Sequence, residues 1–514
     1  MMATPTASSI TISCLFCVSL FLLLCSSKND ALGDGERKAM QSHFHTFQVN
    51  SLLPASVCSP SIKDKRKGRT VSLKVVHKYG PCSHLRPEKT SAPPTLTEIL
   101  TRDQSRVNSI QSRLRQNSLE KDSSSSNSKA TTTIPAKSGI PIGSFNYIVT
   151  VGLGTPKKQL SLVFDTGSAF VWTQCKPCTV FCYKQKQPIF DPSHSATYKN
   201  ITCTSRQCSQ LSSSTSTTPS CSTNTCVYGI GYGDGSTSQG FFASETLTLT
   251  PSDVFPNFLF GCGENNKGEF DGEAGLIGLG RSRLSLVSQI SSKYGNYFSY
   301  CLPSTPSYTG SLTFGKGGRS SAGSSLQFTP LLSKSKDPSS YYVDIIGIKV
   351  GGKTLSISQS VFKTPGSIID SGTAITRLPP AAYDALKTAF RQHMTQYRLG
   401  KPVSGFDTCY RVKKNTTLKI PSISFVFGGN IEVAIDYSGI LLADSSNACL
   451  AFLGNSNSSD LLIFGNAQQK TLDVVYDVAG GKLGFGRRGC SQACLDLYIT
   501  RTENEKNKSY SGVI

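Results

Sequence analysis

The sequence predicts an all-β, mainly antiparallel protein built from two related lobes, with a few short helices. From residue 140 onward, short runs of β-branched and aromatic residues alternate with Gly, Pro, Asn and Ser, which is typical of strands joined by turns. Apolar residues at helical spacing are few in this part of the chain. One motif occurs twice, about 200 residues apart, and indicates that the two lobes repeat one design.

The strands are expected in six apolar stretches. These are YIVTVGLG from residue 147, QLSLVFDTG from 159, FFASETLTL from 241, YYVDIIGIKVGG from 341, SISFVFGG from 422 and TLDVVYDVAGGKLGFG from 471. Two helices are expected, near residues 282 and 380. The second opens with Pro380, which suits the first position of a helix.

The first 140 residues have a different composition. Residues 11–25 form an apolar run that is short for a membrane span and is followed by polar residues, so residues 1–31 are predicted to be a signal peptide. Residues 32 to about 72 are expected to be disordered. Apolar residues at three- and four-residue spacings beside arginines then predict a basic amphipathic helix between Leu96 and Leu114. A Ser/Thr-rich linker follows, where processing enzymes would have access.

The net charge of +21 is densest in the first quarter of the chain. Its sharpest cluster is the run Lys63, Lys65, Arg66, Lys67 and Arg69. Such a run is typical of a solvated segment, and an anionic partner is the less favoured interpretation.

The 18 cysteines indicate an oxidising compartment. Cys175, Cys178 and Cys182 approach the spacing of zinc ligands, so a metal site is an alternative there. The same stretch lacks a convincing His partner, and we therefore expect no metal.

The repeated motif places one aspartate at the end of an apolar strand in each half. LVFDTGSAFVW carries Asp165 and SIIDSGTAITRL carries Asp370. A second pair of similar segments follows these motifs, GLIGLGR at 275–281 and LLIFGNAQQ at 461–469. Each contains a Gly that would let another backbone pass closely.

Two carboxylates brought face to face have a specific chemistry. They cannot both ionise easily and share one proton, so that one serves as base while the other serves as acid. A water between them can lose a proton to one aspartate while the other protonates a scissile carbonyl. This chemistry needs no cofactor and no metal. The alternative is a pair of β-turn aspartates, because Asp-Ser/Thr-Gly also suits turns.

At these residues the sequence resembles the pepsin-like aspartic protease family, in particular the plant branch with the nepenthesins and the chloroplast nucleoid DNA-binding protease. The likeness runs from about Tyr147 to Cys490. It implies a bilobal fold with an active-site cleft between an N-terminal lobe at 136–335 and a C-terminal lobe at 336–490. It also implies a zymogen whose propeptide and linker, residues 32–135, cover the acidic cleft with basic side chains until low pH discharges it. The polar tail at 491–514, which includes Cys494, lies beyond the part of the chain that resembles the family.

The resemblance assigns the catalytic pair to Asp165 and Asp370. The supporting loops comprise the three residues after each aspartate: Thr166, Gly167, Ser168, Ser371, Gly372 and Thr373. The first hydroxyl residue of each loop is expected to join the two loops, and the second to hydrogen-bond its carboxylate.

The resemblance also implies a flap that closes over bound peptide. Tyr232 and Gly233 match its tip, and Trp172 matches the indole that hydrogen-bonds the flap tyrosine. The alternatives are an ordinary hairpin aromatic for Tyr232 and a core residue for Trp172.

Twelve cysteines would form six disulfides in this branch, with Cys409 and Cys449 as a pair within the C-terminal lobe. The twelve are Cys175, Cys178, Cys182, Cys203, Cys208, Cys221, Cys226, Cys262, Cys301, Cys409, Cys449 and Cys490. The sequons Asn200, Asn415, Asn457 and Asn507 are candidates for N-glycosylation.

Other functions fit the sequence less well. It contains neither the G-x-S-x-G of many serine hydrolases nor the H-E-x-x-H of zinc proteases. The alternatives are a catalytically weak binding or inhibitor protein on the pepsin scaffold, and a protease that also binds nucleic acid through its basic N-terminal region. We expect a secreted, extracellular, apoplast-like monomer without a membrane anchor that cleaves proteins or peptides; the chloroplast and the vacuole are alternative locations.

Overall fold

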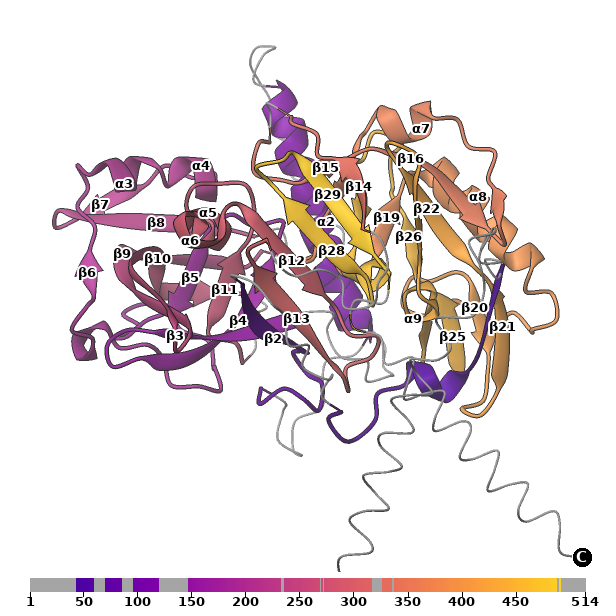
Figure 1. The fold of residues 1–514 in the computed structure, drawn as a ribbon, viewed down its shortest axis with the longest axis horizontal. Helices are drawn as coiled ribbons and strands as arrows, with labels where there is room; N and C mark the ends of the chain where they lie inside the picture. The colour runs from indigo at the N-terminus through magenta and orange to yellow at the C-terminus, as the bar shows by residue number, and fades with distance from the viewer. Residues whose placement is uncertain are drawn as a thin grey trace, which may run out of the picture. The chain divides into compact units, whose positions relative to one another are not determined.

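The chain folds mainly into β-sheets, as the sequence predicts (Figure 1). The computed structural model describes residues 43–59, 70–85, 96–119, 147–232, 235–268, 270, 272–316, 326–334, 337–487 and 490. The predicted signal peptide, the Lys/Arg run at 63–69, the linker and the polar tail lie outside these residues. Residues from Phe44 onward form one unit, and the description below concerns that unit.

One sheet of 15 strands contains β2 to β14 and two strands from the C-terminal end. Its members are β2 (Val71–His77), β3 (Tyr147–Leu153), β4 (Lys158–Asp165), β5 (Val171–Gln174), β6 (Lys199–Asn200), β7 (Ser220–Ser222), β8 (Thr225–Gly231), β9 (Thr237–Thr250), β10 (Asp253–Lys267), β11 (Gly275–Gly278), β12 (Tyr297–Cys301), β13 (Thr309–Phe314), β14 (Gln327–Pro330), β28 (Asp473–Asp477) and β29 (Lys482–Gly486). Because β28 pairs antiparallel with β12, the two halves of the chain share this sheet.

The second half adds smaller sheets. One contains β15 (Tyr342–Val343), β18 (Ser367–Ile369), β27 (Leu462–Phe464), β19 (Thr376–Leu378) and β26 (Phe452–Gly454). A second sheet contains β17 (Lys353–Thr354), β16 (Ile345–Val350), β22 (Ile423–Phe427) and β23 (Ile431–Ala434). A third contains β20 (Cys409–Arg411), β25 (Asn447–Leu450) and β24 (Leu441–Ala443). In the last, β1 (Phe44–Gln48) pairs with β21 (Thr417–Pro421).

Helices are few and mostly single turns within the described residues. They are α2 (Leu96–Leu119), α3 (Arg206–Ser209), α4 (Ser212–Thr215), α5 (Leu286–Gln289), α6 (Ser291–Tyr294), α7 (Ser360–Lys363), α8 (Pro380–Gln392) and α9 (Tyr437–Ile440), with the 3-10 turns η1 (Val49–Leu52), η2 (Pro192–His194) and η3 (Asn466–Gln469). The helix expected near 282 is two short turns, α5 and α6, whereas α8 begins at Pro380 as predicted.

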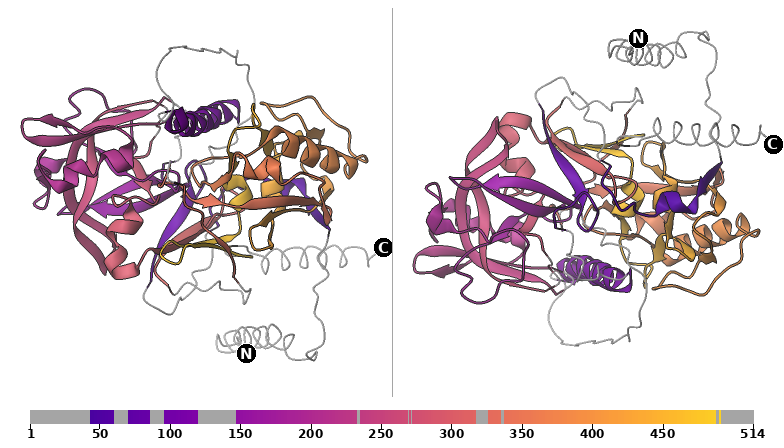
Figure 2. Two further views of the ribbon diagram at one scale, coloured as in Figure 1. Left: turned by 90° about the horizontal axis from the view of Figure 1, so that it is seen from above. Right: turned by 90° about the horizontal axis from the view of Figure 1, so that it is seen from below.

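The basic amphipathic helix is α2, and both halves of the chain contact it. Leu96, Ile99 and Leu100 share an apolar cluster with Ile375 and other residues of the second half. Views from above and below show α2 alongside the strands of both halves (Figure 2). The apolar face that the sequence predicted therefore packs against the rest of the protein.

The internal repeat is present in the sheet topology. In the first half, β4 runs parallel to β11 while β5 runs antiparallel to it. In the second half, β18 runs parallel to β27 while β19 runs antiparallel to it. Asp165 therefore ends β4, whose parallel neighbour β11 lies in the repeated segment 275–281. Asp370 follows β18, whose parallel neighbour β27 lies in the corresponding segment 461–469.

The expectation of disorder over residues 32–72 is wrong for its described parts. β1 pairs with β21 over five residues, and the ring of Phe47 stacks on Tyr437 with centroids 4.4 Å apart. β2 lies between β13 and β3, and a disulfide joins Cys58 to Cys82. These strands form because partners distant in sequence supply the ladder, which local composition does not reveal.

Replacing Gly278 or Gly465 by Ala should lower the free energy of unfolding by about 1–3 kcal/mol, because overpacking forces the backbone to shift. A Cβ atom at Gly278 would collide with the backbone nitrogen of Phe170, and one at Gly465 would lie 2.7 Å from the backbone carbonyl carbon of Ile375. Urea unfolding measures the effect. The control is Gly347→Ala, whose Cβ would meet nothing closer than 3.8 Å. Equal destabilisation by all three substitutions would contradict the prediction.

Candidate active site

The structure brings the two predicted aspartates together in a buried position. Asp165 ends β4 and Asp370 directly follows β18, and their exposed fractions are 1% and 0%. The loops are joined by a reciprocal pair of hydrogen bonds. The Thr166 backbone N–H donates to Ser371 Oγ at 3.0 Å, and the Ser371 backbone N–H donates to Thr166 Oγ1 at 2.8 Å.

The glycine of each loop is required for space. A Cβ on Gly167 would lie 2.7 Å from Asp370 Oδ1, and a Cβ on Gly372 would collide with Asp165 Oδ1. Each glycine N–H also donates to the aspartate of its own loop at 2.9 Å. Neither glycine has a positive φ, so close approach of the two loops, rather than turn geometry, requires glycine here.

Arg106 of α2 lies between the two carboxylates. Its Nη2 donates to Asp165 Oδ1 at 2.8 Å and to Asp370 Oδ2 at 2.9 Å. Its Nη1 donates to Asp165 Oδ2 and its Nε to Asp370 Oδ2, both at 3.1 Å. One guanidinium thus compensates both negative charges. The sequence indicated a basic helix but did not single out this arginine.

The three groups shift one another's pKa values. Burial raises the pKa of Asp165 to about 6; Arg106 opposes this rise and Asp370 adds to it. Burial also disfavours the ionised form of Asp370, but the charge of Arg106 and the hydrogen bonds from Thr373 and Gly372 outweigh it and lower its pKa. Burial opposes the charge on Arg106 as well, but the attraction of the two aspartates raises its pKa. Of the two carboxyls, Asp165 therefore has the higher pKa.

The second hydroxyl residues of the loops differ. Thr373 Oγ1 donates to Asp370 Oδ2 at 2.6 Å, as the sequence predicts. The Ser168 hydroxyl is buried and has no hydrogen-bond partner among the described residues, and the expected bond to Asp165 is not made. The oxygens of Asp165 instead accept from Arg106 and the Gly167 N–H.

The predicted flap contact is also present. Tyr232 follows β8, and the Trp172 indole Nε1 donates to its hydroxyl at 2.6 Å. The ring of Phe270, which sequence analysis did not single out, lies edge-on to both, with centroids 5.1 Å from Trp172 and 6.1 Å from Tyr232. Gly233 lies outside the described residues.

Polar side chains from η3 hydrogen-bond the backbone of the loop that carries the second aspartate. Asn466 Nδ2 donates to the Ser371 carbonyl at 2.9 Å, and Gln469 Nε2 donates to the Asp370 carbonyl at 3.3 Å. Both side chains are fully buried. Sequence analysis identified this segment as part of the internal repeat but did not assign these two amides, although their polarity after an apolar strand was a usable signal.

The twelve cysteines expected to form six disulfides do so in the structure. The pairs are Cys175–Cys262, Cys178–Cys182, Cys203–Cys221, Cys208–Cys226, Cys301–Cys490 and Cys409–Cys449. The zinc alternative is wrong, because all three of its cysteines are disulfide-bonded and leave no thiolate ligand. The sequons Asn200, Asn415 and Asn457 are exposed, and Asn507 lies outside the described residues.

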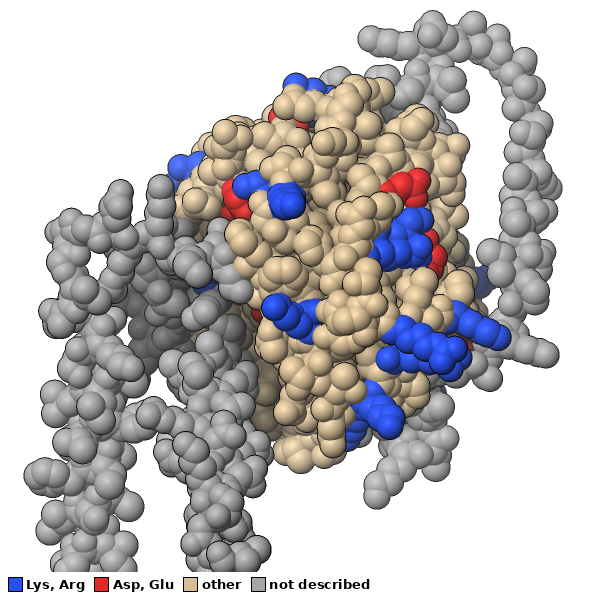
Figure 3. Space-filling view, turned by 90° about the vertical axis from the view of Figure 1, so that its right-hand side faces the viewer, with Lys and Arg blue, Asp and Glu red and all other residues tan. Residues whose placement is uncertain are grey.

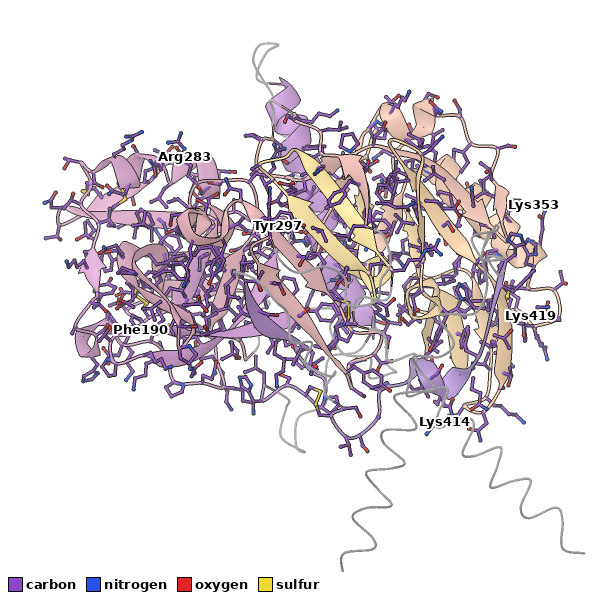
Figure 4. The ribbon with its side chains drawn as sticks, viewed as in Figure 1. Phe190, Arg283, Tyr297, Lys353, Lys414 and Lys419 are labelled. Carbon is purple, nitrogen blue, oxygen red and sulfur yellow. A yellow bond between two sulfur atoms is a disulfide. The ribbon has the colours of Figure 1, made fainter. Side chains whose placement is uncertain are left out.

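Basic side chains gather on the face formed by the outer elements of the second half (Figure 3). Lys353, Lys414 and Lys419, labelled in Figure 4, are all exposed there. Lys419 also lies 4.9 Å from the ring centroid of Phe44 in β1. Among the described residues no helix is long and apolar enough to cross a membrane.

Comparisons with known proteins identify the class. Residues 147–316 match the family described as xylanase inhibitor N-terminal, and residues 340–487 match xylanase inhibitor C-terminal. An aspartyl protease family protein of Arabidopsis thaliana is 49% identical over 475 residues, covering 92% of this chain and 98% of that protein. Aspartic proteinase nepenthesin-2 of Nepenthes gracilis is 38% identical over 355 residues, covering 68% and 78%. The chain belongs to the plant family of pepsin-like aspartic proteases that includes the nepenthesins.

Solved structures share the fold. The crystal structure of edgp matches with a TM-score of 0.55 and 23% identity, and that of soybean basic 7S globulin with 0.53 and 24%. Each match covers 66% of this chain and 91% of the other. At this identity the likeness concerns the fold alone, whereas the relatives named as proteases support an aspartic endopeptidase function.

Replacing Thr166 by Val should lower the free energy of unfolding by about 1–3 kcal/mol, because the buried Ser371 N–H loses its acceptor. Chemical denaturation measures this loss. The control is Ser358→Ala, which removes an exposed hydroxyl and should change stability by less than about 0.5 kcal/mol. A Thr166 variant as stable as the control would show that the loop-to-loop bonds contribute little.

Proposed function

We propose that the chain is the zymogen of an aspartic endopeptidase whose Asp165 and Asp370 activate one water molecule. The position of Arg106 Nη2 carries this proposal. This single atom lies 2.8 Å from an oxygen of Asp165 and 2.9 Å from an oxygen of Asp370. A water oxygen at the same point, once Arg106 has left, would hydrogen-bond both carboxylates.

The reaction follows from the shared proton of the pair. The ionised aspartate removes a proton from the water while the protonated one donates to the carbonyl oxygen of the scissile peptide bond. The water oxygen bonds to the carbonyl carbon and gives a gem-diol. The C–N bond then breaks as the nitrogen takes a proton from one aspartate, and a hydroxyl of the diol returns a proton to the other aspartate, which leaves a carboxylic acid and an amine. The flap that carries Tyr232 would cover the bound peptide and restrict water to this single site.

In the zymogen, α2 would inhibit the site by occupying it. Arg106 stands where the water would, and apolar residues of α2 before and after Arg106 pack against the second half of the chain. Docked Arg106 lowers the pKa values of both carboxylates, so docking releases protons. Protonation must then weaken docking. The attachment is therefore strongest above the higher pKa that Asp165 has without Arg106, and it weakens as the pH falls through the docked value of about 6.

The proposal includes the processing and location expected from the sequence. Residues 1–31 would be removed as a signal peptide and 32–135 as propeptide and linker, leaving lobes at 136–335 and 336–490 with the cleft between them. The mature monomer would be secreted and act on proteins or peptides without cofactor or metal. The exposed positions of Asn200, Asn415 and Asn457 and the six disulfides support an oxidising, glycosylating route.

A binding or inhibitor function is the second candidate, because the matching families are described as xylanase inhibitors. Against it stands the completeness of the site: both aspartates, the reciprocal loop bonds and the Trp172–Tyr232 contact are all present. The basic run on which the nucleic-acid alternative rests lies outside the described residues, so that alternative stays a prediction from the sequence.

Replacing Asp165 or Asp370 by Asn should each abolish peptide cleavage between about pH 3 and 6, because the pair can no longer share one proton. Wild-type protein freed of its propeptide should cleave, and pepstatin should inhibit it. Circular dichroism verifies that the variants remain folded. A folded wild-type protein without pepstatin-sensitive cleavage would favour the binding function instead.

Replacing Arg106 by Gln should let the zymogen become active at a higher pH than the wild type, because the docked helix no longer compensates the two carboxylates. Processing on gels and cleavage of a peptide substrate are followed across pH 4–8. Arg102→Gln removes the same charge from the same helix and should leave the pH of activation near that of the wild type. Identical shifts in both variants would mean that the total charge of α2, not the contact of Arg106, sets the pH.

A further inference from the structure

Arg377 is a second buried arginine near the catalytic loop. It lies in β19, and 3% of the residue is exposed. Its Nη2 donates to Asp103 Oδ2 at 2.7 Å, and its Nη1 donates to Gln104 Oε1 at 2.6 Å. Its Nε is buried and has no hydrogen-bond partner in the described part of the chain. Within the described part of the chain, the Arg377 guanidinium therefore hydrogen-bonds only to side chains of α2.

The Asp103 carboxylate occupies a complete anion receptor. Besides Arg377, the backbone N–H of Ala374 donates to Asp103 Oδ1 at 2.6 Å, and the N–H of Ile375 donates to Oδ2 at 3.4 Å. These two residues directly follow Thr373, which hydrogen-bonds the catalytic Asp370. Two fixed N–H groups and a guanidinium thus converge on one carboxylate beside the catalytic centre, and this arrangement favours anions.

The receptor and the catalytic pair are separated by a distance that a substrate could span. Asp103 and Arg106 are three residues apart on α2, so their Cβ atoms are about 5–6 Å apart. An extended peptide advances about 3.3–3.6 Å per residue. With the reach of the side chains, an acidic residue within about three positions of the scissile bond would meet Arg377.

We propose that Arg377, once α2 has left, binds an acidic side chain of the substrate and gives the protease a preference for Glu or Asp at one position near the scissile bond. This inference rests on the proposed protease function. In the zymogen, Asp103 occupies the subsite that the substrate carboxylate later takes. A purely structural ion pair would only anchor α2 and would leave the mature enzyme indifferent to substrate charge.

The test uses acid-activated wild-type protein and pairs of fluorogenic peptides. Each pair differs only by Glu or Gln at one of the four positions on either side of the scissile bond, and kcat/KM is measured near pH 5.5, where free Glu is mostly ionised. At one position wild type should cleave the Glu peptide about ten-fold or more faster, the value of a charge-assisted hydrogen bond. The difference should reside mainly in KM.

Variants then assign the preference to this side chain. Arg377→Gln should remove it while the Gln peptides are still cleaved, Arg377→Lys should retain part of it, and Arg377→Glu should favour Lys at the same position. The control, Lys349→Gln, removes a surface charge paired with Glu432 and should keep the wild-type preference. Active wild-type enzyme without a Glu preference at any position overturns the inference, even if every Arg377 variant misfolds. Absence of cleavage of all peptides, neutral ones included, would overturn the proposed protease function instead.

Discussion

Two carboxylates held within reach of a single atom are the constraint on which the rest of the site depends. In a buried, low-dielectric position two like charges repel strongly, so the pair needs either a shared proton or a neighbouring cation. Here the guanidinium of Arg106 supplies the cation. The reciprocal bonds between Thr166 and Ser371 fix the distance between the loops, and glycine after each hydroxyl residue permits it, because any Cβ would strike the opposite carboxylate.

The same constraint explains why so much of the N-terminal segment is ordered. A cation sits between the aspartates only if its backbone is anchored, and the apolar face of α2 provides this anchor through two clusters that it forms with residues of the second half. β2 adds six residue pairs to β13, and Lys78 forms a buried ion pair with Glu273 at 2.5 Å. A cut in the linker would not release these contacts. Discharge of the catalytic aspartates weakens one anchor, and the strand ladder of β2 must still open before the segment can leave.

Sequence alone predicted what is encoded locally or repeated. The strand before each aspartate, the apolar face of α2 and the start of α8 at Pro380 follow from patterns within a few residues. What it missed depends on partners far along the chain. β1 forms because β21 offers an edge, and the oxygens of Asp165 accept from Arg106 and the Gly167 N–H rather than from Ser168. Which arginine of the basic helix would reach the aspartates depends on how α2 docks, and no local pattern reports that.

The helical state of α2 also explains how a protease could hold its own segment without cutting it. Hydrolysis requires a peptide carbonyl beside the aspartates, but the carbonyls of a helix point along its axis and are bonded within it. What α2 presents to the carboxylates is the side chain of Arg106, whose nitrogen fills the place proposed for the water. Asp103 meanwhile forms an ion pair with Arg377. A bound extended peptide would instead place a carbonyl group beside the two aspartates. Its acidic side chain would still offer a carboxylate to Arg377, as Asp103 does. The helix α2 therefore resembles a substrate at Arg377 but not at the catalytic aspartates.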